Sequence, residues 1–105
     1  SYQHLLRLHI LTELEKGFEL LKRLHTLGIE GRQDEQLDYL AETLKVWEAR
    51  ATLVQRSPPG SFLEPLLNVR RALLNIAADQ HPPLASHLAT ELSRCWLHSA
   101  KLARR

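Results

Sequence analysis

SFLEPLLNVRRALLNIAAD, from Ser61 to Asp79, is the most apolar helical stretch of the 105-residue chain. At about 100° per residue, its apolar side chains form a band that covers more than half of the helix circumference. Ser61 and Glu64 have the spacing of a capping box, in which each side chain binds a free backbone N–H at the start of a helix. This stretch therefore predicts a central helix at about 61–79, with neighbours on several sides.

One charged residue interrupts the apolar band of this helix. Arg70 projects into the band, whereas Arg71 points to the polar side. A guanidinium group in apolar surroundings is costly unless a carboxylate meets it, and its planar shape suits two carboxylate oxygens. Glu13 lies in the apolar sector of the first predicted helix, so we hypothesise an Arg70–Glu13 ion pair that ties the two helices together. In the alternative, Arg70 lies at the edge of its band and extends to water.

The rest of the chain has the same helical character. The breakers SPPGS at 57–61 and HPP at 81–83 separate the apolar periodic segments, and no segment alternates in the manner of a strand. The chain is predicted to form four helices, at about 2–27, 34–56, 61–79 and 84–104. Gly17 lies inside the first of them, where glycine costs about 1 kcal/mol relative to alanine, so we expect another backbone to approach it closely.

Four helices joined by short loops predict a single all-α segment made of two antiparallel hairpins. Both a closed four-helix bundle and a slice of an α-solenoid of the TPR or HEAT kind fit this pattern. A second apolar stripe at Tyr39, Val46 and Leu53 favours the solenoid, as does Leu97 on the polar side of the last helix, because solenoid helices contact two layers. The core is expected to centre on Leu14, Phe18, Leu44, Trp47, Leu66, Leu73, Leu92 and Trp96.

Three leucines lie off the main apolar stripes and form the candidate interaction surface. Leu97 is expected to be exposed, or covered by another molecule, where a following helix would pack. Leu5 and Leu8 are either scattered exposed leucines or residues that face a helix preceding Ser1. Such exposed apolar residues would promote self-association of the excised segment.

Composition places the chain among ordinary folded proteins. Apolar residues make up 44% and charged residues 25%, and the 14 Lys and Arg against 12 Asp and Glu are spread along every segment. This balance does not indicate nucleic-acid binding, and the basic run at 101–105 suits a helix C-terminus. The single Cys95 excludes an internal disulfide, and no apolar run is long enough to span a membrane. We expect a cytosolic or nuclear location and, since methionine is absent, a start inside a longer protein.

The side chains that could carry chemistry do not form a site in the sequence. His87, Glu91, Cys95 and His98 follow one side of the last helix, but a zinc site needs ligands that converge from more than one element, so a polar helix face is favoured. The four glycines are dispersed, which excludes a phosphate-binding loop, and no Ser/His/Asp arrangement can be argued. We expect no catalytic residue, metal or cofactor. A free-standing helical interaction domain of an unrelated intracellular protein is one functional interpretation.

Three blocks of sequence support a different interpretation: YQHLLRLHILTELE at 2–15, EPLLNVRRALL at 64–74 and RCWLHSAKLARR at 94–105. In this order and spacing they resemble the FAT region of ATR-type checkpoint kinases, in the phosphatidylinositol 3-kinase-related family. The resemblance spans nearly the whole chain and is loose between residues 28 and 61. It implies a non-catalytic scaffold of TPR- and HEAT-like helical hairpins that wraps around a kinase domain.

The same resemblance implies a parent protein with its own activity and partners. That parent would be a nuclear serine/threonine protein kinase that responds to DNA damage and stalled replication with the partner ATRIP. The kinase motifs would lie beyond Arg105, so the segment itself is expected to be inert and to contact neighbouring FAT helices and the kinase domain. In the family the helix that contains CWL opens a hairpin, whose second helix this chain lacks.

Overall fold

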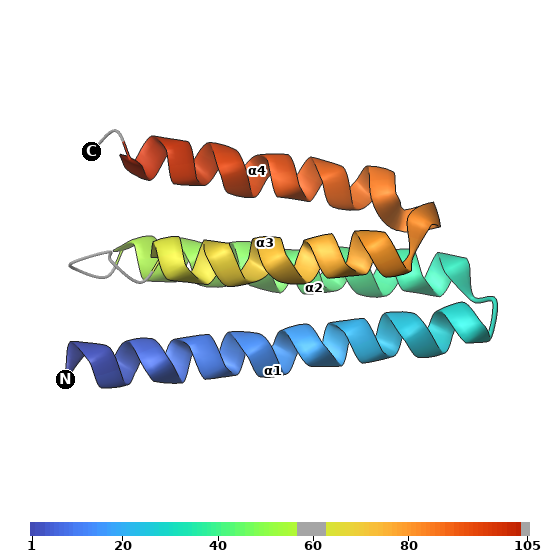
Figure 1. The fold of residues 1–105 in the computed structure, drawn as a ribbon, viewed down its shortest axis with the longest axis horizontal. Helices are drawn as coiled ribbons and strands as arrows, with labels where there is room; N and C mark the ends of the chain where they lie inside the picture. The colour runs from blue at the N-terminus through green and yellow to red at the C-terminus, as the bar shows by residue number, and fades with distance from the viewer. Residues whose placement is uncertain (57–62, 104–105) are drawn as a thin grey trace.

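The computed structural model of the chain describes residues 1–56 and 63–103. These residues form α1 (Tyr2–Ile29), α2 (Gln33–Arg56), α3 (Leu63–Gln80), a single 3-10 turn η1 (Pro82–Leu84) and α4 (Ala85–Ala103) (Figure 1). The prediction of an all-α chain with four packed helices is confirmed. The expected helix start at Ser61, its capping box and Phe62 lie outside the described residues.

The first turn follows from a glycine that lies beyond the expected end of the first helix at about residue 27. α1 continues past Gly28 to Ile29, and Gly31 carries the positive φ of 69° that ends the helix. The N–H of Arg32 donates to the carbonyl of Leu27 at 2.9 Å, and the N–H of Gly31 donates to Gly28 at 3.1 Å. These two bonds form a Schellman motif, which satisfies the last carbonyls of α1 and directs the chain into α2.

α3 occupies the centre of the molecule, as its wide apolar band predicts. α1 packs on one side of α3 and α4 on the other, while α2 lies behind this layer against α1 and α3 (Figure 1). The eight buried residues of α3 are Leu63, Leu66, Leu67, Arg70, Arg71, Leu73, Leu74 and Ala77. The molecule is an elongated slab of 44 × 26 × 20 Å, with α1 and α4 at opposite edges.

Two aromatic residues that were expected in the core are not there. Phe18 is 60% exposed and Trp96 is 62% exposed, which contradicts the prediction for both. The other six expected core residues are buried or half-buried: Leu14, Leu44, Trp47, Leu66, Leu73 and Leu92. Phe18 points outward because α1 turns Gly17 toward α3. Trp96 points outward because Leu88 and Cys95 form the buried face of α4.

Gly17 marks a close approach of α3 to α1, through the side chain of Leu73 rather than the backbone that we expected. Gly17 is buried, and a β-carbon added to it would overlap Cδ1 of Leu73 and lie 2.8 Å from Cδ2 and 3.0 Å from Cγ. Leu73 therefore occupies the space that any other residue at position 17 would need. This contact sets both the spacing of the two helices and the rotation of α1.

Gly17→Ala should destabilise the chain, although alanine is intrinsically better than glycine in a helix by about 1 kcal/mol. Because the added methyl group collides with Leu73, we expect a net loss of about 1–3 kcal/mol in the free energy of unfolding. Leu73→Ala should cost about 2–5 kcal/mol, and the double variant should cost less than the sum because the new methyl group fills part of the cavity.

Urea denaturation of the four proteins, followed by circular dichroism, measures these effects. Asn75→Ala, at an exposed position of α3, is the control and should change the stability by less than about 0.5 kcal/mol. A Gly17→Ala variant that is as stable as the parent chain would contradict the close contact.

Candidate functional site

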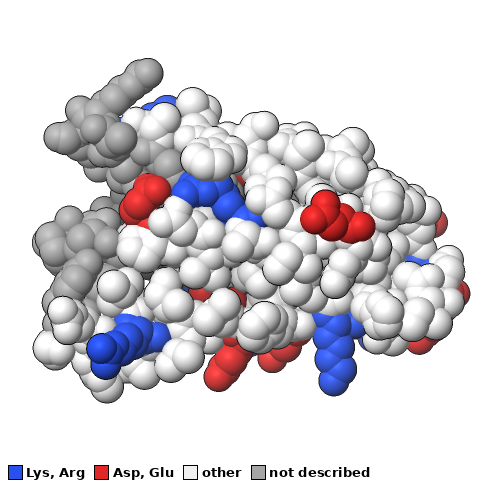
Figure 2. All heavy atoms as spheres, viewed as in Figure 1, with Lys and Arg blue, Asp and Glu red and all other residues white. Residues whose placement is uncertain are grey.

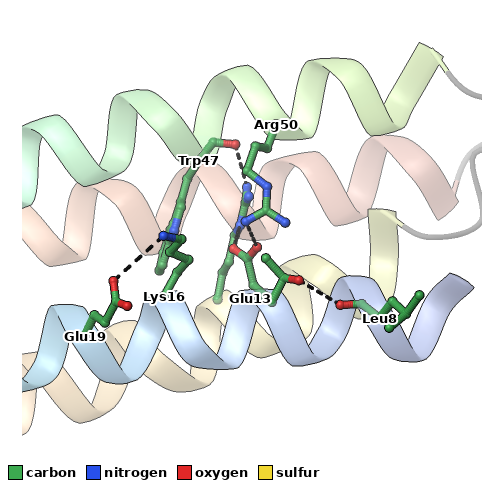
Figure 3. A network of polar contacts seen from close by, with 8 residues as sticks. Leu8, Glu13, Lys16, Glu19, Trp47 and Arg50 are labelled. Atoms are coloured by element: carbon green, nitrogen blue, oxygen red, sulfur yellow. Dashed lines mark hydrogen bonds and ion pairs between the residues drawn. The ribbon is translucent and has the colours of Figure 1, made fainter.

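The most unusual feature of the interior is a fully buried carboxylate. Glu13 on α1 is 0% exposed, and Nε of Arg70 on α3 donates to its Oε1 at 2.6 Å. From α2, Nη1 of Arg50 lies 2.7 Å from its Oε2, and Figure 3 shows Glu13 and Arg50 pointing toward each other. The structure thus joins Arg70 to the partner hypothesised from the sequence. Arg70 is only 3% exposed, so the alternative in which it extends to water is wrong.

Arg70 also contacts α2, which makes it a link between three helices. Its Nη1 donates to the backbone carbonyl of Trp47 at 2.8 Å, and its guanidinium carbon lies 5.1 Å from the centre of the Trp47 ring. Burial lowers the pKa of Arg70, and the hydrogen bond to Glu13 opposes this effect. An arginine remains protonated at physiological pH, so the buried group is a cation.

The charges in this cluster do not balance. Arg50 and Arg70 supply two positive charges, and Glu13 supplies one negative charge. Three buried polar atoms lack a hydrogen-bond partner among the described residues: Nη2 of Arg70, Nε1 of Trp47 and Oε2 of Glu13. Arg50 interacts with Oε2 of Glu13 through its charge, because none of its N–H groups is aligned for a hydrogen bond to this oxygen. The cluster contains no nucleophile or acid–base pair, so its chemistry is suited to holding helices together rather than to catalysis.

A second arginine, Arg71, is also more buried than the sequence indicated. Arg71 is 8% exposed, and its Nη2 bonds Oδ1 of Asn68 and lies 3.6 Å from Oε1 of Glu64. Its guanidinium carbon lies 4.2 Å from the centre of the Trp96 ring. The exposed tryptophan therefore covers a cation, in the geometry of a cation–π interaction, instead of filling the core.

The four residues considered as metal ligands do not form a site. Among residues 1–56 and 63–103, no group of three or more His, Cys, Asp or Glu side chains could hold a metal ion. Cys95 is buried, and its burial, together with the charge of Glu91, raises the pKa of the thiol, which makes it a poor nucleophile. Burial likewise raises the pKa of Glu91.

A groove between α2 and α4 was not expected from the sequence. One part of it has a volume of about 500 Å³ and is lined by residues of three helices, including Ala51, Leu67 and Leu97. A second hollow of about 400 Å³ continues between the same two helices and shares Glu91 and Arg94 with the first. Single-helix periodicity cannot show such a groove, because it depends on how far apart two helices lie.

The predicted interaction surface is exposed but divided between two edges. Leu5 and Leu8 on α1 are 50% and 48% exposed, and Leu97 on α4 is 58% exposed. α1 and α4 lie on opposite sides of α3, so these residues cannot form one patch (Figure 1). In the second apolar stripe of α2, the side chains of Val46 and Leu53 are also exposed to solvent.

Charge does not mark a binding surface on the face that α1, α3 and α4 form together. Figure 2 shows only scattered Lys, Arg, Asp and Glu side chains on this face, without a continuous basic or acidic area in the described part of the chain. No helix in that part has the length and apolar character that crossing a membrane would require.

Comparison with known proteins identifies relatives. The family described as the FAT domain matches residues 1–105. The serine/threonine-protein kinase ATR of Drosophila melanogaster is 30% identical over 109 residues, which cover 99% of this chain. The chain spans only 4% of the length of that kinase. No solved structure matches the chain.

Glu13→Gln and Arg70→Met should each destabilise the chain strongly. Glu13→Gln leaves the buried cation of Arg70 without a carboxylate, and Arg70→Met removes the buried hydrogen bonds to Glu13 and to the Trp47 carbonyl, so that only Arg50 still faces Glu13. We expect each to cost about 3–5 kcal/mol and the double variant to cost clearly less than the sum. The exposed pair Lys16–Glu19, 3.9 Å apart on the same helix, is the control, and removing it should leave the denaturation midpoint nearly unchanged. Strictly additive single effects would show that Glu13 and Arg70 do not interact.

Stability should also fall in mild acid because of His81. His81 is buried beside Gly28, and its Nε2 lacks a hydrogen-bond partner in the part of the chain that the structure describes. Burial, assisted by the charge of His25, lowers the pKa of His81 from the usual 6.5. The unfolded chain then binds this proton more readily than the folded chain, so stability is fully present above about pH 6.5 and declines as the pH drops through the lower folded pKa.

His81→Gln should reduce this decline, and thermal melts between pH 5 and 8 measure it. His4→Gln, at an exposed position, is the matched control and should leave the decline unchanged. Equal pH profiles for the parent chain and His81→Gln would rule out this role.

Proposed function

This chain belongs to the FAT domain family, and we propose that it is a non-catalytic scaffold segment of an ATR-like serine/threonine protein kinase. The observation that carries this proposal is the buried Glu13 cluster. Its polar groups form ion pairs and hydrogen bonds that join three helices, and none is arranged to act on a substrate. A segment built in this way works by keeping its shape and by presenting helix faces to other parts of the protein.

We propose further that the two hairpins are a slice of a TPR- or HEAT-like stack. Its support is the placement of α1 and α4 on opposite sides of α3, since a closed bundle would bring its first and last helices together (Figure 1). Leu97 on α4, together with Val46 and Leu53 on α2, then faces the neighbouring hairpins of the stack.

The proposed parent is a nuclear kinase of the DNA-damage and replication-stress checkpoint. The likeness to the kinase ATR of Drosophila melanogaster supports this role, as do the three blocks of sequence described above. Within that parent the segment would pack against neighbouring FAT helices and the kinase domain, and ATRIP is the proposed separate partner. The competing proposal is a free-standing interaction domain. It predicts that the exposed faces of α2 and α4 do not pack against other parts of a longer chain.

Leu97→Asp separates the two proposals. In the isolated chain Leu97 is exposed, so the substitution should change the free energy of unfolding by less than about 0.5 kcal/mol. In the full-length parent it should strand a carboxylate between packed helices and reduce both kinase activity and ATRIP co-purification. Glu42→Ala, at an exposed position of α2, is the control that should change neither. A parent protein that tolerates Leu97→Asp as well as the isolated chain does would overturn the scaffold proposal.

A further inference from the structure

α1 carries a second stripe of residues that faces away from the core. We call it the outer stripe, and its seven positions alternate in steps of three and four: Leu8, Leu11, Glu15, Phe18, Lys22, His25 and Ile29. This spacing is the heptad spacing of helices that pack lengthwise against each other. The apolar members are well exposed, at 48% for Leu8, 56% for Leu11, 60% for Phe18 and 74% for Ile29.

The outer stripe lies on the opposite side of α1 from the residues that α1 buries. Glu13, Gly17, Leu20, Leu24 and Leu27 form the buried side toward α2 and α3. In Figure 1, α1 forms one edge of the molecule and has no other helix beyond it. The stripe is therefore open along a helix of 28 residues, which is about 42 Å long at 1.5 Å per residue.

The charges of the outer stripe are divided between its two halves. Glu15 lies in the N-terminal half, and Lys22 and His25 lie in the C-terminal half. The structure gives neither Glu15 nor Lys22 an ion-pair partner among the residues it describes. Two parallel copies of the stripe would place like charges opposite each other, whereas two antiparallel copies would place Glu15 opposite Lys22.

We propose that the outer stripe is a self-association surface, on which α1 pairs antiparallel with α1 of a second copy of this chain. The two-fold axis passes near Phe18, the middle of the seven positions. This symmetry places Leu8 of one copy against Ile29 of the other and Glu15 against Lys22, and it stacks the two Phe18 rings together. The same rotation places Leu11 against His25. The apolar contacts of Leu8 with Ile29 and of the two Phe18 rings, together with the acid–base match of Glu15 with Lys22, are what select a second copy as the occupant.

The size of this contact sets its strength. A lengthwise pair of helices of this length, with half-exposed leucines and one phenylalanine on each, buries on the order of 1,000 Å² in total, near the lower limit of specific interfaces. The dimer is therefore weak and reversible. This inference concerns the chain itself and does not depend on the proposed function, because it uses only residues of α1.

Sedimentation velocity of the 105-residue chain over a range of concentrations tests the proposal. The parent chain should dimerise reversibly, and Phe18→Asp should weaken dimerisation at least tenfold without changing the helical circular dichroism, because Phe18 is exposed and lies outside the buried core. Glu15→Lys and Lys22→Glu should each weaken dimerisation about tenfold, and the double variant should restore it to near the parent level.

The matched controls are Arg23→Glu, at an exposed position of α1 away from the stripe, and Leu97→Asp on α4, both of which should leave dimerisation unchanged. A strict monomer at millimolar concentration would overturn the proposal. So would a dimer that Leu97→Asp abolishes and Phe18→Asp does not, because its interface would lie on α4. Failure of the double charge variant to recover dimerisation would overturn the antiparallel arrangement.

Discussion

A single buried carboxylate constrains how the helices of this chain fit together. Glu13 is inaccessible to solvent and lies between Arg70 of α3 and Arg50 of α2, and Arg70 also bonds the backbone of α2. If α1 slid by one turn along α3, both charges would stay buried without partners, which is far more costly than an exposed charge. The cluster therefore selects one alignment of three helices. Apolar burial supplies the net stability, as it does in most domains.

The contact between Gly17 and Leu73 reinforces the same alignment one turn away. Glu13 and Gly17 are four residues apart on α1, and Arg70 and Leu73 are three apart on α3, so each pair of positions lies on one helix face. The ion pair determines which residues are level with each other, and the glycine determines how closely the helices approach. Together they fix the rotation of α1 about its own axis. The outward direction of Phe18 and of the whole outer stripe follows from that rotation.

The arrangement explains why the polar groups buried among the described residues serve structural contacts rather than catalysis. The groups that could do chemistry are neutralised by burial or used in structural contacts: the Cys95 thiol has a raised pKa, and the Arg71 guanidinium is shared by Asn68, Glu64 and Trp96. Large apolar side chains also remain exposed along α1, α2 and α4. Membership of the FAT family agrees with a segment that packs against other parts of a longer kinase chain.

The sequence by itself determined the all-α class and the four packed helices, because helical periodicity and breakers are local properties. It also identified Glu13 as the partner of Arg70, since a charge in an apolar band needs an opposite charge in another band, and Glu13 was the carboxylate that fitted. Only the tertiary structure decided that Arg50 joins them, that Phe18 and Trp96 are exposed, and that a groove separates α2 from α4. The physical reason is that the apolar stripes here are wide. A wide stripe allows several rotations of the helix, and the choice among them is made by contacts between residues far apart in the chain, such as Leu73 against Gly17.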